Sequence, residues 1–154
     1  METELIKINK KKFKELCNDS DILRATKVIK EGGLVAFPTE TVYGLGANAL
    51  RQEASKKIYA AKGRPSDNPL IVHISEINDV KALVSEIPKN FEVLTEKFWP
   101  GPMTLVLKKS DIVPAATSGG LDTVGIRMPE SDVARALIKA SGVPIAAPSA
   151  NISG

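Results

Sequence analysis

Residues 121–147, LDTVGIRMPESDVARALIKASGVPIAA, contain the pattern that decides the fold: a strand, then a helix, then a second strand. The run TVGIR at residues 123–127 predicts the first strand. Ser131 or Asp132 can cap the helix, whose apolar residues recur at helical spacing, and Gly142 ends it. Strands separated by helices of this length indicate an α/β domain.

The same alternation continues through the rest of the chain. Asp19 or Ser20 can cap a helix that the glycine pair at residues 32–33 ends, and another helix is expected at about residues 52–61. The expected strands are residues 5–8, 34–37, 70–74, 103–107, 123–127 and 143–147. Two helical stretches lie between the third and fourth of these strands, and Pro88 opens the second one at a favoured first-turn position. We therefore expect a largely buried sheet, mixed or mostly parallel, flanked by helices.

The composition is typical of one soluble globular domain over residues 1–154. The chain is 43% hydrophobic and 25% charged, with a net charge of +3. Five lysines and three glutamates in the first 16 residues supply +2 of that charge, so net charge says little about partners. Cys17 is the only cysteine, and neither a signal peptide nor a spanning apolar run occurs. A cytoplasmic protein without a membrane segment is expected.

Two loops after predicted strands are rich in small and polar residues. They are PTETVYGLGANA at residues 38–49 and PSANISG at residues 148–154. In open α/β sheets, ligands bind at loops that leave the carboxyl ends of strands. These two loops, and those after Ile74 and Arg127, are therefore the first places to look for a site.

The phosphates of a nucleotide would need an unusual grip in this sequence. The segment Gly44-x-Gly46-x-x-Ala49 matches a relaxed dinucleotide fingerprint, but it lies six residues beyond its strand, and the GxxxxGK[ST] loop is absent. Lys and Arg side chains with loop amides would have to hold such a ligand. Lys62 and Arg64 in KGRPSDNP are the strongest candidates. The alternative is a helix cap whose cations face water.

His73 and Arg127 each allow two interpretations. His73 lies in an apolar strand, where it is either a partnered core residue or a ligand-binding group, and no Cys/His cluster accompanies it to form a zinc site. Arg127 closes its strand and can bind a carboxylate or phosphate in two parallel hydrogen bonds, or pair with Glu130 or Asp132. WPGP at residues 99–102 is interpreted as a turn packed under its tryptophan. No Gly-x-Ser-x-Gly nucleophile elbow occurs.

Five motifs follow one another in a fixed order. They are PTETVYGLG (38–46), KGRP with NPLIVH (62–73), WPGPMT (99–104), GLDTVGIRMP (120–129) and APSAN (147–151). From about residue 20 to residue 154 this order closely resembles the YrdC-like family of threonylcarbamoyl-AMP synthases. The resemblance implies the YrdC-like fold, a twisted α/β sheet around a large positively charged cavity.

The resemblance also implies a nucleotidyltransferase reaction in the cytoplasm. L-threonine, bicarbonate or CO2, and ATP give threonylcarbamoyl-AMP and pyrophosphate, and no protein nucleophile is needed. Family positions that bind threonine are matched by Thr41, His73 and Arg127, and by Ala147 through its backbone. Positions around ATP are matched by Lys62, Arg64, Asn68, Thr123, Ser149 and Asn151. Lys62 and Arg64 would position the phosphates and neutralise their charge.

The implied partners follow from that reaction. Mg²⁺ would accompany ATP, although no carboxylate cluster in the sequence identifies a protein ligand for it. The product would pass to the tRNA threonylcarbamoyl transferase machinery, which modifies adenosine 37 of ANN-decoding tRNAs. Family members continue past the APSAN motif, so the chain is expected to lack the C-terminal part of the domain.

Two alternatives stay open at this point. The first is a module that binds double-stranded RNA or tRNA through the cationic cavity without adenylation. The second is the related carbamoyl-adenylate domain of hydrogenase-maturation proteins, which uses carbamoyl phosphate and normally sits in a longer chain with zinc-finger cysteines.

Overall fold

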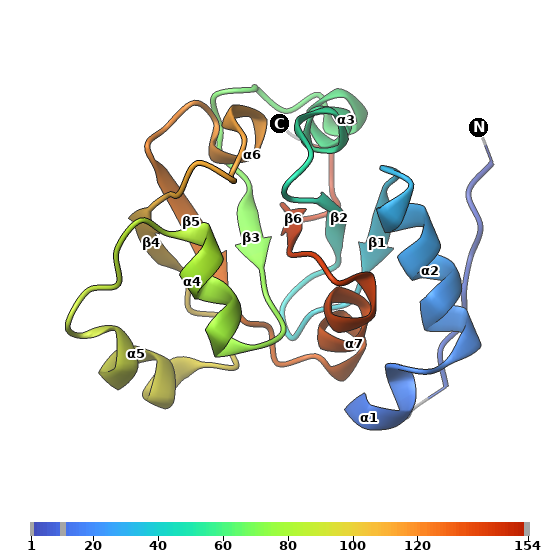
Figure 1. Cartoon of the computed structure of the whole chain (residues 1–154). Coiled ribbons are helices and arrows are strands. Elements are labelled where there is room, and N and C mark those ends of the chain that lie inside the picture. The colour runs from blue at the N-terminus through green and yellow to red at the C-terminus, as the bar shows by residue number, and fades with distance from the viewer. Residues whose placement is uncertain (1, 10–11, 153–154) are drawn as a thin grey trace.

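A six-stranded sheet in the order β1-β2-β6-β3-β5-β4 forms the centre of the protein (Figure 1). The computed structural model describes residues 2–9 and 12–152. The strands are β1 (Val35–Phe37), β2 (Gly44–Asn48), β3 (Ile71–His73), β4 (Leu105–Lys108), β5 (Thr123–Arg127) and β6 (Ile145–Ala147). Only the β3–β5 pair is parallel among these strands, and the other four pairs are antiparallel. The expected mixed sheet is confirmed, and the mostly parallel alternative is wrong.

The reason for the antiparallel pairing is β2, which the sequence did not reveal. Its sequence, GLGAN, has no β-branched residue, and such a pattern favours a loop. The strand pairs with β1 as a hairpin, Phe37 opposite Gly44, and with β6 on its other side. A strand that returns directly beside β1 makes that connection antiparallel.

The helix ends follow the local signals in the sequence. The helices are α1 (Phe13–Leu16), α2 (Ser20–Lys30), α3 (Gln52–Lys62), the 3-10 turn η1 (Ile77–Asp79), α4 (Val80–Leu83), α5 (Phe91–Phe98), α6 (Ala115–Ser118) and α7 (Asp132–Ser141). The Asp19 side chain accepts from the Asp21 amide, and Ser131 caps α7 through the Ala134 amide. These contacts confirm the expected N-caps of α2 and α7.

Two expectations about local structure are wrong. Residues 5–8 form no strand; Ile6 and Ile8 pack instead against the helical clusters beside α1, α2 and α7. Pro88 does not open a helix, because α5 begins at Phe91, whose amide donates to the Pro88 carbonyl in a preceding turn. In both places tertiary packing overrides a weak local signal.

The two faces of the sheet have different covers. Val72, Ile126 and Ala146 belong to the core that α3, α4 and α5 complete on one face. Phe37 and Ile145 pack on the other face among apolar residues of α2 and α7, which lie beside β1 and β6 in Figure 1. These helices cover the second face at β1 and β6. On the same face, β3 and β5 carry candidate site residues.

Gly46 allows Phe37 to lie across the second face. A Cβ atom at this position would lie 2.6 Å from both Ile145 Cγ2 and Phe37 Cε1. We predict that Gly46→Ala lowers the free energy of unfolding by about 1–3 kcal/mol, because a packed core resists an added methyl group. Urea unfolding measures this change. Gly44→Ala is the control, since its added Cβ would lie 3.2 Å from the nearest atom, Phe37 Cζ. An equal loss of stability in both variants would contradict this explanation.

Candidate functional site

Strand register places His73 and Arg127 side by side on the second face of the sheet. His73 of β3 is opposite Arg127 of β5 in the parallel pair and opposite Ile145 of β6 in the antiparallel pair. Side chains at directly opposite positions project from the same face. A cavity of about 80 Å³ opens here, and its lining includes Thr39, His73, Arg127, Ala147 and Ser149.

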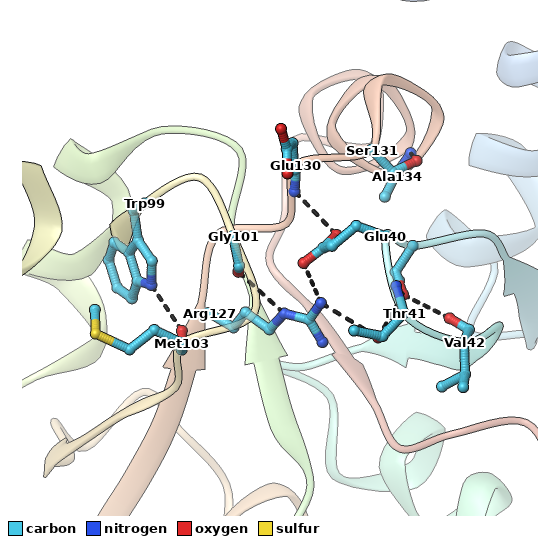
Figure 2. Close-up of polar contacts among 11 residues, drawn as sticks. Glu40, Thr41, Val42, Trp99, Gly101, Met103, Arg127, Glu130, Ser131 and Ala134 are labelled. Atoms are coloured by element: carbon cyan, nitrogen blue, oxygen red, sulfur yellow. Dashed lines mark hydrogen bonds and ion pairs between the residues drawn. The ribbon is translucent and has the colours of Figure 1, made fainter. Parts of the chain in front are cut away.

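Arg127 is held from two sides by the protein. Its Nε donates to the Gly101 carbonyl at 3.3 Å, and its Nη2 forms a salt bridge with the Glu40 carboxylate (Figure 2). The Thr41 hydroxyl lies 3.5 Å from the same Nη2, at the outer limit of a hydrogen bond. Only 11% of the Arg127 side chain and 16% of the Glu40 side chain are exposed.

The salt-bridge partner of Arg127 differs from both expected ones. Glu130 and Asp132 are exposed, and the carboxylate that pairs with Arg127 comes from Glu40 in the loop between β1 and β2. Glu130 contributes instead its backbone amide, which donates to Glu40 Oε2 at 3.1 Å. The expected partners are near in sequence, but the loop brings a distant carboxylate into contact.

Glu40 is the site residue that sequence reasoning missed. It is the only acidic residue at positions 38–49, and that was the available signal. Burial raises the pKa of Glu40. The hydrogen bond and charge of Arg127, together with two backbone amides, lower this pKa by more, so the net shift is downward. The carboxylate is therefore ionised at neutral pH.

His73 is both a buried residue and part of the cavity wall. It is 4% exposed, its Nδ1 lies 3.1 Å from the Ile71 carbonyl, and the Phe37 ring meets it edge-on. Burial, with a smaller contribution from the Arg127 charge, lowers the pKa of His73 to about 4. The imidazole is therefore neutral at physiological pH. The interpretation as a partnered, buried histidine is confirmed.

Lys62 connects α3 to the chain after β6. Its side chain is 3% exposed, and its ammonium donates to the backbone carbonyls of Ser149 and Asn151. Burial, and then the charge of Arg64, lowers the pKa of Lys62. The alternative of a cation that faces water at a helix end is wrong for this residue, because its ammonium is buried against these two carbonyls. Gly63, in the left-handed conformation, forms the C-cap of α3.

Arg64 and Asn68 lie in the turn after α3. The Arg64 guanidinium donates to the carbonyls of Asn68, at 3.1 Å, and Pro69, at 2.8 Å, so it holds this turn together. Gly119, four residues before Thr123, approaches Asp67 and Pro69 so closely that a Cβ would lie 3.0 Å from their backbone atoms. Thr123 thus begins β5 after a loop that packs on the turn.

Two groups of predicted residues meet at Ser149, and Arg64, Asn68 and Thr123 belong to neither of them. Thr41, His73, Arg127 and Ala147 surround or adjoin the cavity. Lys62 binds Ser149 and Asn151, and Ser149 also lines the cavity. The side chain of Asn151 is exposed, and its Nδ2 donates to the Ile152 carbonyl. The last two residues of the loop at 148–154 lie outside the described residues.

The WPGP turn takes part in the site as well. The predicted packing is confirmed: Trp99 is 6% exposed and its Nε1 donates to the Met103 carbonyl at 2.7 Å. The Trp99–Pro100 peptide bond is cis. Gly101, the next residue, supplies the carbonyl that Arg127 contacts, so the turn helps to hold the guanidinium (Figure 2).

Residues 2–9 and 12–152 contain neither a metal-ligating cluster nor a membrane-spanning helix. No group of three or more His, Cys, Asp or Glu side chains lies together there in a way that could hold a metal ion. None of the helices in those ranges has the length and apolar character needed to cross a bilayer.

Comparison with known proteins gives this geometry a context. The family described as "Telomere recombination", Sua5/YciO/YrdC, matches residues 27–154. The chain belongs to this family. A threonylcarbamoyl-AMP synthase of Pyrococcus abyssi is 61% identical over 130 residues, which are 84% of this chain and 38% of that relative. The chain thus spans less than half of that relative.

Solved structures of Sua5/YciO/YrdC relatives share the fold. The crystal structure of P. abyssi Sua5 complexed with L-threonine has 60% identity and a TM-score of 0.86, covering 87% of this chain and 39% of that one. A full-length HypF structure in its phosphate- and nucleotide-bound form has 28% identity and a TM-score of 0.75, covering 89% of this chain and 18% of that one. The expected α/β fold is confirmed. The large cationic cavity stays a prediction.

Lowering the pH should remove stability that depends on neutral His73. Its folded pKa of about 4 lies below the ordinary 6.5, so the unfolded chain takes up the proton first. This stability is fully present above pH 6.5 and is lost as the pH falls through about 4, about 3 kcal/mol in total. Urea unfolding of the unmodified chain and His73→Gln between pH 7 and pH 4 measures it. A difference between the two proteins that is constant with pH would contradict this prediction.

Proposed function

We propose that this chain takes part in threonylcarbamoyl-AMP synthesis, with L-threonine, bicarbonate or CO2, and ATP as substrates. The observation that carries the proposal is the Arg127 guanidinium beside a small cavity that joins a buried lysine through Ser149. The name of the 61%-identical relative supports the reaction, and the threonine complex of P. abyssi Sua5 supports the amino acid.

Arg127 is the proposed partner of the threonine carboxylate. A guanidinium recognises a carboxylate by hydrogen bonds of defined geometry. The Thr41 hydroxyl and the neutral imidazole of His73 would bind the remaining polar groups of threonine, and the Ala147 backbone would complete the pocket. A neutral imidazole can donate from one ring nitrogen and accept at the other, which suits a hydroxyl or amine ligand.

The reaction asks mainly for positioning and for neutralisation of charge. Bicarbonate takes up a proton, which the threonine ammonium can supply, and loses water to give CO2. The neutral amine then attacks the carbon of CO2, and the new C–N bond forms as the nitrogen releases a second proton to solvent, which leaves a carbamate. A carbamate oxygen then attacks the α-phosphorus of ATP, and the bond to pyrophosphate breaks. No bond to the protein forms, so the contribution of the chain is to align two anions and offset their charge.

Lys62 and Arg64 are the proposed cations for the triphosphate, with Asn68, Thr123, Ser149 and Asn151 around the nucleotide. The similar full-length HypF was solved in a phosphate- and nucleotide-bound form, which supports a nucleotide as the class of ligand. The Ser149 and Asn151 carbonyls use two of the three N–H donors of the Lys62 ammonium, so one donor is left for a phosphate oxygen. Mg²⁺ is expected to arrive with ATP; the described residues form no carboxylate cluster for it, and no step above depends on one.

The product is proposed to serve the transferase that modifies adenosine 37 of ANN-decoding tRNAs. Such a partner fits the chemistry, because a mixed carbamic–phosphoric anhydride is an activated acyl donor. A direct contact with tRNA is a separate question that salt-dependent binding would answer.

The reaction class is tested by pyrophosphate release. The chain is incubated with ATP, bicarbonate and each amino acid in turn, and pyrophosphate is measured. We expect release that depends on both threonine and bicarbonate. Release without threonine would contradict the proposal. Salt-dependent tRNA binding with no threonine-dependent release would support the RNA-binding alternative, and release that needs carbamoyl phosphate would support the carbamoyl-adenylate alternative.

Arg127→Lys tests the amino-acid pocket. The lysine ammonium keeps the charge. It lacks the planar, branched guanidinium with which Arg127 contacts Gly101 and Glu40 and would contact a ligand at the same time. Loss of a charge-assisted hydrogen bond should weaken threonine binding about 10-fold to 100-fold, with a much smaller effect on ATP. Titration of each substrate against the variant measures both affinities. An effect on ATP alone would move Arg127 to the nucleotide side.

A further inference from the structure

Arg127 uses only part of its hydrogen-bonding capacity inside the protein. Nε contacts Gly101, and Nη2 contacts Glu40 and Thr41. Within residues 2–9 and 12–152, Nη1 has no protein hydrogen-bond partner, and Figure 2 shows it free of the contacts drawn around Nη2. The side chain lines the cavity, so one terminal nitrogen is left to meet a ligand.

Glu40 and Gly101 fix the direction in which that nitrogen points. An arginine side chain has several rotatable bonds, and holding it in one conformation costs entropy each time a ligand binds. Contacts at Nε and Nη2 fix the plane of the guanidinium before a ligand arrives. Gly101 belongs to a turn anchored by buried Trp99, and Glu40 supplies the only charged contact to Arg127 among the described side chains.

Glu40 is itself anchored at a second point. Oε1 accepts from Arg127 and Oε2 accepts from the Glu130 amide at 3.1 Å. Both contacts require an acceptor, which a carboxylate provides with each oxygen. A glutamine has one acceptor oxygen and one NH2 group, so it can satisfy one partner but must turn a donor toward the other. The arrangement is specific for a carboxylate.

We propose that Glu40 is a positioning residue of the amino-acid pocket: it holds the Arg127 guanidinium so that Nη1 faces the carboxylate of the bound amino acid. This inference rests on the proposed function and extends it to a residue outside the cavity lining. Glu40 acts through Arg127 and does not touch the substrate.

The test compares Glu40→Gln with the unmodified chain by calorimetric titration of threonine and, separately, of ATP. We expect the dissociation constant for threonine to rise about 10-fold, the effect of one charge-assisted contact, while that for ATP changes less than 2-fold. Glu76→Gln is the matched control. It removes the same charge from a surface pair with Lys139, in which both side chains are about half exposed, and it should change neither affinity.

A double variant separates positioning from a merely structural role. If Glu40 acts through Arg127, then Glu40→Gln added to Arg127→Lys should weaken threonine binding by less than 2-fold beyond Arg127→Lys alone. Glu40→Asp, which keeps two acceptor oxygens, should lose less affinity than Glu40→Gln, and it serves also if Glu40→Gln does not fold.

Three results would overturn the inference. They are unchanged threonine affinity in Glu40→Gln, equal weakening of threonine and ATP, and fully additive effects in the double variant. If the unmodified chain itself binds no threonine, the proposed function fails, and the inference falls with it. That result is distinguishable because it is seen before any substitution is made.

Discussion

The position of β3 between β5 and β6 is the constraint on which the site depends. This strand has three residues and pairs in parallel with β5 and antiparallel with β6. That register sets His73 beside Arg127 on one face and buries Val72 in the core on the other. A shift of one residue would exchange the two faces, placing an ionisable group in the core and an apolar one in the cavity. Core packing therefore fixes the site.

Each buried cation of the site has a distinct protein partner. Arg127 pairs with a carboxylate, whereas Lys62 is solvated by two backbone carbonyls. A buried charge without partners is costly, so these contacts stabilise the two cations in the folded protein. They also differ in what they leave for a ligand. Arg127 leaves the terminal nitrogen Nη1, and Lys62 leaves one of the three N–H donors of its ammonium.

Local signals predicted most helices and strands, but not how the strands pair. Asp19, Ser131 and Gly142 marked helix ends correctly, because a cap is a contact between residues near in sequence. The strand GLGAN was not predicted, because glycine is uncommon in strands. Its two glycines leave room for the Phe37 ring, and this contact is visible only in the tertiary structure. The missed strand explains why the sheet was expected to be more parallel than it is. The predictions for Pro88 and for residues 5–8 were wrong because tertiary packing overrides weak local preferences.

The sequence alone carried the five ordered motifs, and with them the family and the candidate cations. These features reside in residue identity and order, which the chain states directly. Only the tertiary structure decided that Arg127 pairs with Glu40 rather than Glu130 or Asp132, and that Lys62 is buried against Ser149 and Asn151. Both contacts join segments more than 80 residues apart. Charge and spacing make many such pairs possible, and these are selected because the packing of the sheet, α3 and the loops after β1 and β6 brings the distant partners together.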